Sequence, residues 1–342
     1  MAYLPGIVGD ALMYVCVIVN PLARKNRDHS GDRSVELRRI LGPWGEVHET
    51  RSIHELRAVV QRLDRRVSHL VSDGGDGSLH WLINEMRSHV SDPERWPTFV
   101  PTNGGTIDFV ARKARVRGHA GAILDALVAA AEADRSPSEV TLDSLELDGE
   151  TVDGATFRRI GFALAAGGVG NRFFDMYYQD RDPGPAAIVR VVARVVRDFA
   201  FAKVVRRESN RTDYAAQLFR PTRARVVIDG DEVPTRVHSA LHAGSIDVNL
   251  GRVLRIFPKA REPGALHFQA GELSAAKIIA NVPALVAGGA IRGERLRDVH
   301  GREMLIEIED EPLAPIIDGE RFAGIVRLAI CAGPRVRIAR VG

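Results

Sequence analysis

The sequence predicts an α/β domain followed by an all-β domain, and three observations lead to this fold class. Apolar runs typical of buried strands alternate with helical periodicity as far as about residue 135. The composition then changes at "ADRSPSE", and beyond it strictly alternating apolar and polar residues dominate. A chain of 342 residues that is 45% hydrophobic is long enough for two such domains, which we place at 1–135 and 136–342.

The first domain is expected to contain a parallel sheet covered by helices. "YVCVIV" is a continuous β-branched run that ends at an Asn-Pro pair, as in a strand buried on both faces. The further strands are expected at 46–49, 67–72 and 96–101, and the helices at 34–41, from 52 onward, at 79–90 and at 120–133. Ser52 followed by Glu55 predicts a capping box at the start of the second helix.

The second domain is expected to be an antiparallel β-sandwich. Its predicted strands are "EVTLDSLELDG", "RRIGFALAAGG", "RARVVIDGDEV", "HSALHAGSIDV", "REMLIEIED" and "VRLAICAG". Two helical stretches, 185–206 and 273–291, interrupt them. We leave open that the last strands return toward the first domain.

The bulk composition excludes several classes of protein. Forty-seven basic against 44 acidic residues give a formal charge of +3, too small for a nucleic-acid binder. Cys16 and Cys331 form neither a disulfide framework nor a set of metal ligands, which favours a reducing, cytoplasmic setting. No apolar run is long enough to span a bilayer, so a membrane-bound substrate would require peripheral association with the membrane surface.

The loop "SDGGDGS" follows a predicted strand and precedes a predicted helix. Glycine lets backbone N–H groups converge on a phosphate, and the helix adds its positive end. Asp76 would repel a phosphate unless a divalent cation lies between them, which favours a nucleotide site that uses Mg²⁺. The loop lacks the Lys-Ser or Lys-Thr end of a Walker motif. An ordinary strand-to-helix turn is the alternative interpretation.

With these residues in place, the chain resembles the diacylglycerol kinase catalytic family, bacterial lipid kinases related to diacylglycerol and sphingosine kinases. The resemblance extends over nearly the whole chain through "VIVNP", "GGDGS", "GGTIDFVAR", "FALAAGGVG", "NLGRVLRIFPKA" and "IIDGERF". It implies that ATP and Mg²⁺ are the cofactors and that a lipid hydroxyl accepts the phosphoryl group. The residues placed at the nucleotide by this resemblance are Asn20, Pro21, Thr50, Gly74, Gly75, Asp76, Gly77, Ser78, His80, Gly105 and Thr106.

Asp-Gly pairs flanked by acidic residues occur in "LDGE", "IDGDE" and "IDGE". Such pairs between alternating strands predict hairpin turns. Only the last lies where the family carries its catalytic Asp-Gly-Glu, which implies that Glu320 takes the proton of the lipid hydroxyl while Asp318 and Asp76 organise Mg²⁺. Whether Asp76 or Glu320 is the base stays open. The remaining acidic residues of these motifs, expected in turns, are Asp148, Glu150, Asp229 and Glu232.

Three positions depart from the family pattern. Asp108 and Phe109 stand where many bacterial relatives have Asn-Asp, and Pro263 stands where relatives with a structural Mg²⁺ carry aspartate. Proline offers no side-chain oxygen, so we predict that the structural metal is absent while the catalytic Mg²⁺ remains. Three cations of the "NPLARKNR" loop are expected either to face phosphates or to lie in solvent, namely Arg24, Lys25 and Arg27.

Two segments of the second domain are candidates for the lipid side. Residues 186–207 place Arg190, Arg194 and Arg197 on one helical stripe among apolar residues. This helix is expected either to meet anionic headgroups or to pack on its own domain. Residues 273–290 are expected to line an acyl-chain cleft, with a kink at Pro283.

The leading hypothesis is therefore an ATP-dependent lipid kinase, acting on a lipid such as diacylglycerol or a sphingoid base in phospholipid metabolism. Its expected partners are the lipid at a membrane surface and, in a homodimer, a second copy of the chain, with no nucleic acid. A soluble-substrate kinase of the NAD kinase type shares Gly-Gly-Asp-Gly but explains the late Asp-Gly-Glu less well. A lipid-binding module without phosphotransfer would explain the departures at Asp108, Phe109 and Pro263.

Overall fold

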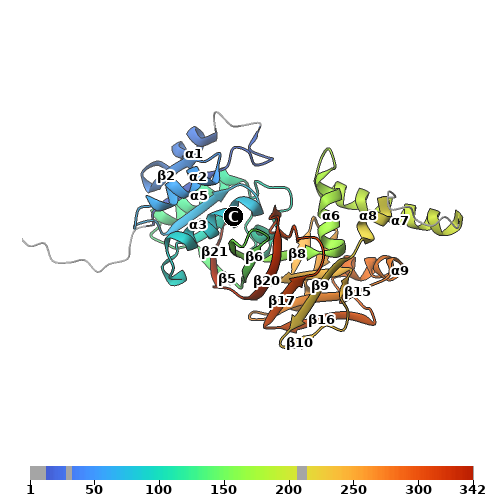
Figure 1. Cartoon of the computed structure of the whole chain (residues 1–342). Coiled ribbons are helices and arrows are strands. Elements are labelled where there is room, and N and C mark those ends of the chain that lie inside the picture. The colour runs from blue at the N-terminus through green and yellow to red at the C-terminus, as the bar shows by residue number, and fades with distance from the viewer. Residues whose placement is uncertain (1–12, 28–32, 206–213, 342) are drawn as a thin grey trace, which may run out of the picture.

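The computed structural model describes residues 13–27, 33–205 and 214–341. These residues form an α/β part followed by an all-β part, and the C-terminal strand returns to the first part (Figure 1). The first sheet has the strand order β2-β1-β3-β4-β21-β5. Its strands are β1 (Val15–Val19), β2 (Gly45–Glu49), β3 (His69–Asp73), β4 (Thr98–Pro101), β5 (Ser138–Leu142) and β21 (Val336–Arg340). The strands β2, β1, β3 and β4 run parallel, as the sequence predicts.

The helices of the first part follow its strands in the expected order. They are α1 (Arg33–Leu41), α2 (Ile53–Gln61), α3 (Asp76–His89), the short α4 (Phe109–Lys113) and α5 (Ala120–Glu132), with 3₁₀ turns at Gly42–Trp44 and Pro93–Arg95. Ser52 caps α2 by accepting the backbone N–H of Glu55 at 3.2 Å. The carboxylate of Glu55 accepts from the N–H of Arg51, at 2.7 Å, so the capping box closes one residue before the predicted position.

The C-terminal strand β21 completes the first sheet. Ile338 in β21 pairs in parallel with Phe99 in β4 and antiparallel with Val140 in β5. Both Ile338 and Phe99 are fully buried. The final strand therefore returns from the second part and is locked into the core of the first.

The second part contains two antiparallel sheets packed face to face, so the α/β plus all-β fold class is confirmed. One sheet has the order β10-β9-β17-β20-β6-β7, with β11 paired to β9, and the other has the order β16-β15-β12-β8-β18-β19. Phe157 and Val226 from the first of these sheets and Leu241 and Phe268 from the other lie in one apolar core, which is typical of a sandwich.

The strands of the second part are β6 (Leu145–Thr151), β7 (Thr156–Gly161), β8 (Ala163–Gly167), β9 (Thr222–Ile228), β10 (Asp231–Glu232), β11 (Val237–His238), β12 (Ala240–Gly244), β15 (Leu266–Glu272), β16 (Arg295–Gly301), β17 (Glu303–Ile308), β18 (Ile316–Ile317), β19 (Glu320–Arg321) and β20 (Ile325–Ala332), with a separate hairpin of β13 (Val248–Leu250) and β14 (Leu254–Ile256). Its helices are α6 (Gly168–Tyr178), α7 (Pro185–Val205), α8 (Tyr214–Phe219), α9 (Ala275–Ala280) and α10 (Val282–Ala287), and a 3₁₀ turn spans Pro258–Arg261.

The prediction of a turn at Asp148 and Glu150 is wrong. Both residues lie inside β6, between β7 and β20, and a Cβ on Gly149 would come within 2.6 Å of the Arg327 carbonyl oxygen. Glycine here permits close approach of a neighbouring strand. The turn that joins β6 to β7 instead contains Gly154, whose φ is +79°.

The Asp-Gly pair at Asp229 does form the predicted turn. Asp229 and Gly230 have φ values of +51° and +85°, as a two-residue hairpin requires. The prediction that Glu232 belongs to this turn is wrong, because the residue already pairs with Val227 as part of β10.

Several elements of the second part differ from the predicted ones. The stretches 139–149 and 158–168 each divide into two strands that belong to different sheets. The helices α6 and α8 were not predicted. The predicted helix 273–291 divides into α9 and α10 at Asn281, two residues before Pro283, so the predicted break is confirmed. Residue 206, the predicted end of the long helix α7, lies outside the described residues, in which no helix is long and apolar enough to cross a bilayer.

Ile338→Ala is expected to lower the free energy of unfolding by about 2–5 kcal/mol, because it leaves a cavity between β4 and β5. Urea unfolding followed by circular dichroism measures this change. Arg340→Ala, two residues along the same strand at an exposed position, is the control and should shift stability by less than about 0.5 kcal/mol. Equal effects of the two substitutions would contradict a buried β21.

Candidate functional site

The site begins where two glycine turns cross at the carboxyl ends of β3 and β4. The N–H of Gly104 donates to the Gly74 carbonyl at 3.1 Å. A Cβ on Gly75 would lie 2.8 Å from the Cα of Gly105, and a Cβ on Gly105 would lie 2.5 Å from the Cα of Gly75. Only glycine permits this backbone contact, which leaves the first turn of α3 open to a ligand.

Most of the predicted nucleotide residues surround this crossing. Asn20, after β1, donates from its amide to the Ser78 hydroxyl at 2.8 Å and accepts the N–H of Leu22 at 2.9 Å. Seven of the predicted residues line a cavity, namely Asn20, Gly75, Asp76, Gly77, Ser78, Gly105 and Thr106. The other four lie behind them and outside the lining, namely Pro21, Thr50, Gly74 and His80.

Asp76 is the first residue of α3, and the start of α4 fixes its carboxylate. The two oxygens accept the backbone N–H groups of Phe109 and Val110, each at 3.1 Å. Burial and the neighbouring Asp108 raise the pKa of Asp76 to about 8, despite these hydrogen bonds. A buried carboxylate with other acidic groups beside it, as Asp76 is, is expected to bind a cation.

Lys25 accounts for the unusual aspartate at position 108. The carboxylate of Asp108 accepts the N–H of Gly105 at 2.8 Å and pairs with the Lys25 ammonium at 3.1 Å. Asp108 is 2% exposed, and its φ of +52° is left-handed. The lysine thus neutralises a buried charge and ties the loop after β1 to the second glycine turn, instead of facing a phosphate.

The final hairpin brings the second part of the chain to this site. Asp318 and Gly319, with φ values of +51° and +91°, form the turn between β18 and β19. One oxygen of Asp318 accepts the N–H groups of Phe162 and Ala163, both at 2.9 Å, and the other lies 3.1 Å from His80 Nδ1. Asp318 thus makes three contacts with protein donors, against two for Asp76, so the structure favours a positioning role for Asp318 and leaves the predicted role at the metal to Asp76.

The side chain of Glu320, in β19, lies against the first turn of α3. Its Oε2 accepts the indole N–H of Trp81 at 3.1 Å. Its Oε1 faces Gly77 so closely that a Cβ on that glycine would come within 2.0 Å of the oxygen. Two carboxylates from the two halves of the chain, Glu320 and Asp76, therefore meet at the start of one helix.

Sequence reasoning missed the residues that align α3 with the second part. The Asn84 amide exchanges hydrogen bonds with the backbone of Ile160 in β7, at 2.8 and 2.9 Å. Trp81 packs against Phe322 with ring centroids 5.6 Å apart, and the guanidinium of Arg159 lies over both rings. The spacing of His80, Trp81 and Asn84 on α3 is the only sequence signal for this contact.

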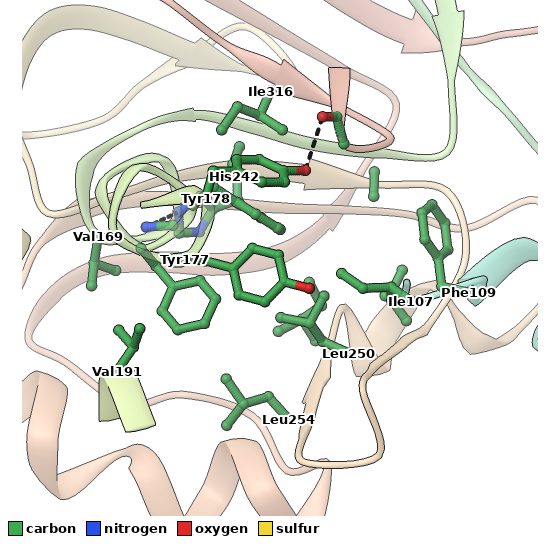
Figure 2. A pocket seen from close by; sticks show the side chains of 18 of the residues that line it. Ile107, Phe109, Val169, Tyr177, Tyr178, Val191, His242, Leu250, Leu254 and Ile316 are labelled. Carbon is green, nitrogen blue, oxygen red and sulfur yellow. Dashed lines mark hydrogen bonds between the residues drawn. The ribbon is translucent and has the colours of Figure 1, made fainter. Parts of the chain in front are cut away.

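The cavity of about 440 Å³ continues from the glycine turns into an apolar region between α6, α7, α9 and α10 (Figure 2). His242 lies at its floor, accepting the Gly170 N–H at 3.2 Å and bonding to Gln269 at 3.2 Å. The apolar lining includes Val169, Phe173, Phe174, Tyr177, Val191, Val192, Val195, Leu218, Leu250, Leu254, Phe257, Leu273, Ile278, Ile279, Val282 and Leu285. Residues of both segments 185–205 and 273–290 thus face one cavity.

The arginines of α7 bind to their own part of the protein. Arg190 pairs with Asp180 at 2.8 Å, and the guanidinium of Arg194 lies 4.0 Å from the centre of the Tyr214 ring. Arg197 lies 3.7 Å from the carboxylate of Asp198. The apolar side of α7 packs with α6 and α8, so the packing interpretation describes this helix better than a free amphipathic surface.

The other predicted features have these positions. Arg24 pairs with Asp182 and donates to the Pro183 carbonyl at 2.8 Å, and Arg27 donates to the Leu22 carbonyl at 3.0 Å. Pro263 is exposed, and the absence of a structural metal there stays a prediction. Among the described residues, the one group of three side chains close enough to share a metal is Cys16, Glu46 and His48 on β1 and β2, away from the cavity lining.

Comparison with known proteins gives one family match and several similar folds. Residues 14–140 match the family model of the diacylglycerol kinase catalytic domain. A solved structure described as a putative diacylglycerol kinase from Bacillus anthracis str. Sterne is 15% identical, with 96% of this chain and 97% of that chain covered and a TM-score of 0.59. A second, described as a diacylglycerol kinase from the same strain, is 14% identical, with 96% of each chain covered and a TM-score of 0.56.

A more distant likeness is to yeast NADH kinase complexed with NADH, at 11% identity and a TM-score of 0.47, over 96% of this chain and 84% of that chain. A search of curated protein sequences finds no match. The structural likenesses support the fold, and the match to residues 14–140 confirms the resemblance read from the motifs.

Gly77→Ala is expected to leave the fold intact and to displace the Glu320 carboxylate, because the new Cβ meets the mobile end of that side chain. Alanine in a helix is itself stabilising by about 0.5–1 kcal/mol relative to glycine. Any catalytic rate that depends on Glu320 should therefore fall by roughly 10²-fold while the melting temperature stays unchanged or rises.

Gly75→Ala is the matched comparison, because its Cβ meets the Gly105 backbone, which cannot swing aside. This variant should lose thermal stability as well as activity. Thermal unfolding and a steady-state assay on both variants would measure the difference. A large loss of stability in Gly77→Ala would contradict the proposed contact.

Lys25→Met is expected to lower the melting temperature by leaving the buried Asp108 carboxylate without its cation. Asp108→Asn in the same chain should recover most of that loss, since the neutral amide needs no cation. Differential scanning fluorimetry of the single and double variants completes the cycle. Additive losses would show that the ion pair does not couple the two loops.

Proposed function

We propose that the protein is an ATP-dependent lipid kinase that phosphorylates a lipid hydroxyl, such as that of diacylglycerol or a sphingoid base, because residues 14–140 match the family model of the diacylglycerol kinase catalytic domain. One observation carries the proposal. A single cavity joins the glycine turns and Glu320 at one end to an apolar region at the other. The phosphoryl donor and the apolar acceptor would thus bind in the same cavity.

The apolar character of this cavity favours a lipid over a soluble acceptor. A nucleotide or sugar acceptor requires several convergent hydrogen-bonding groups. Here the region beyond the glycine turns is lined by aliphatic and aromatic side chains of α6, α7, α9 and α10. Acyl chains gain free energy by leaving water for such a region, at about 25 cal/mol per Å² of apolar area.

The glycine turns would bind the phosphates of ATP through backbone N–H groups and the positive end of α3. Mg²⁺ bound with the nucleotide would be held by Asp76 and would neutralise phosphate charge. The raised pKa of Asp76 fits this assignment, because a nearby cation relieves the cause of the shift.

Glu320 is the proposed proton acceptor. Trp81 fixes one of its oxygens, and the other faces the first turn of α3 beside Asp76. The lipid hydroxyl oxygen would form a bond to the γ-phosphorus as the bond to the β,γ-bridging oxygen of ATP breaks, and the hydroxyl proton would move to Glu320. The products would be the phosphorylated lipid and ADP.

The departures from the family pattern are compatible with catalysis, which disfavours a non-catalytic lipid-binding module. The negative charge of Asp108 is balanced by Lys25. Phe109 contributes its backbone N–H to Asp76, a contact that does not depend on its side chain. The geometry of the acidic pair is thus retained.

Exposed apolar side chains on two of the helices that line the cavity favour peripheral contact with a membrane. Val189 and Phe201 on α7 are 51% and 65% exposed, and Val286 on α10 is 51% exposed. These two helices also contribute residues to the apolar lining. A bilayer touching them would lie close to the region proposed for the acyl chains.

Purified protein incubated with labelled ATP, Mg²⁺ and a panel of lipid and soluble acceptors is expected to transfer label to a lipid. Glu320→Gln and Asp76→Asn should each lower turnover by at least ~10²-fold, and circular dichroism should show that both variants keep the fold. Glu150→Gln is the matched control, because it makes the same change in the other Asp-Gly-Glu sequence, at an exposed position in β6. Label on NAD or a sugar, or full activity in Glu320→Gln, would refute the assignment.

A further inference from the structure

Three side chains that the proposed phosphotransfer does not use lie together on the first sheet, namely Cys16 in β1 and Glu46 and His48 in β2. Cys16 pairs with Glu46, and Ile18 pairs with His48, in the parallel register of these strands. Because side chains alternate along a strand, the three project from one face of the sheet. The cysteines alone indicate no such group, since its other two members come from the neighbouring strand.

The geometry of the three side chains suits a single metal ion. The Sγ of Cys16, one carboxylate oxygen of Glu46 and one ring nitrogen of His48 all lie within 4.8 Å of one another. Glu46 Oε1 and His48 Nε2 are 3.3 Å apart. The ligands of a tetrahedral zinc ion, each about 2.0–2.3 Å from the metal, are separated by roughly 3.3–3.8 Å. Small rotations of the side chains would therefore place one ion between all three.

An ion can reach this group from the edge of the sheet. β2 is the first strand in the order β2-β1-β3-β4-β21-β5, so no further strand of the described chain lies beyond it (Figure 1). The side chains of His48 and Glu46 are 36% and 35% exposed, whereas Cys16 is buried. The ion would enter at the two exposed ligands, and Glu46 would turn away from the thiol to admit it. Exposed side chains change rotamer in picoseconds to nanoseconds.

The charges around Cys16 are compatible with a bound cation. Burial and the carboxylate of Glu46 raise the pKa of the Cys16 thiol, so the thiol is protonated in the metal-free protein. A metal ion would outweigh both effects, because a coordinated thiol gives up its proton. Arg66, which interacts electrostatically with Glu46, is already paired with Asp64 at 2.7 Å. The group can therefore exchange one proton for a metal ion.

The mixture of ligand atoms selects the class of metal. Thiolate and imidazole are ligands for zinc and similar transition metals, whereas Mg²⁺ and Ca²⁺ prefer oxygen. Three protein ligands leave the fourth position of a zinc ion to water. None of the three side chains lines the cavity that contains Asp76 and Glu320, so this group is separate from the proposed site of phosphotransfer.

We propose that Cys16, Glu46 and His48 bind one zinc ion, with a water molecule as the fourth ligand. The ion links β1 to β2, the strands that lead to Asn20 and Thr50. It stabilises the pairing of these strands and takes no part in phosphotransfer. The proposal goes beyond the lipid kinase function and does not depend on it.

Co²⁺ is the probe, because it replaces zinc in such sites and its absorption spectrum reports the ligands. Metal-free, full-length protein with reduced thiols is titrated with CoCl₂. A near-ultraviolet charge-transfer band from thiolate to Co²⁺ should appear and saturate at one ion per chain. Excess Zn²⁺ should remove the band, and excess Mg²⁺ should leave it unchanged. Free zinc at ten times its Kd should raise the melting temperature by roughly 2–4 °C.

Two variants with matched controls locate the ion. Cys16→Ser should abolish the charge-transfer band, whereas Cys331→Ser, at the exposed cysteine, should keep it. His48→Gln changes a partly exposed residue at the sheet edge and leaves the core intact, and it should weaken Co²⁺ binding by at least about tenfold. His54→Gln makes the same change at an exposed position on α2 and should bind Co²⁺ as the wild type does. Circular dichroism checks the fold of each variant.

Several results would overturn the proposal. Co²⁺ bound without a charge-transfer band, or a band that Cys331→Ser removes and Cys16→Ser keeps, would place the ion elsewhere. Equal Co²⁺ affinity of His48→Gln and the wild type would exclude the imidazole as a ligand. Failure to bind either Co²⁺ or Zn²⁺ would exclude the site altogether. None of these results bears on phosphate transfer to a lipid, which Glu320→Gln tests separately.

Discussion

The contact between the final hairpin and the first turn of α3 is the constraint on which the site depends. Asp318 satisfies its buried carboxylate with two backbone N–H groups at the β7 to β8 junction and with His80. A buried carboxylate tolerates few other positions, because an oxygen without a partner would cost several kcal/mol. Glu320, two residues later, therefore reaches Gly77 and Trp81 in a fixed orientation.

The path of the chain after the hairpin reinforces this contact. β20 joins the sandwich through β17 and β6, and β21 then enters the first sheet beside β4. The hairpin is thus followed by strands anchored in both parts of the molecule. At its tip Tyr178 donates to the Gly319 carbonyl, which adds a link to α6 and to the apolar region. The hairpin therefore contacts both the acidic end of the cavity and α6 at its apolar end.

The first part of the fold was predictable because its signals are local. Buried runs, caps and glycine turns are fixed by residues close in sequence, as at β1 and at Ser52. The second part was less predictable, because alternating apolar and polar residues indicate a strand but not the strand with which it pairs. Thus residues 139–149 divide between two sheets, and Gly149 marks a close strand rather than a turn. In the site, the glycine loop and the late Asp-Gly-Glu could be recognised from the sequence. The contacts of Trp81, Lys25 and Tyr177 could not be predicted, because their partners are distant in sequence.

The site also carries a cost that its ligands would relieve. The pKa of Asp76 is raised to about 8 in the folded protein, so folding takes up a proton there at intermediate pH. The stability linked to this group is complete below its unfolded value near 3.8 and is lost as the pH rises toward 8. The unpaired hydroxyl of Tyr177 is a second such cost. Both residues line the cavity, and a cation held at Asp76 would remove the first of these costs and so stabilise the folded chain.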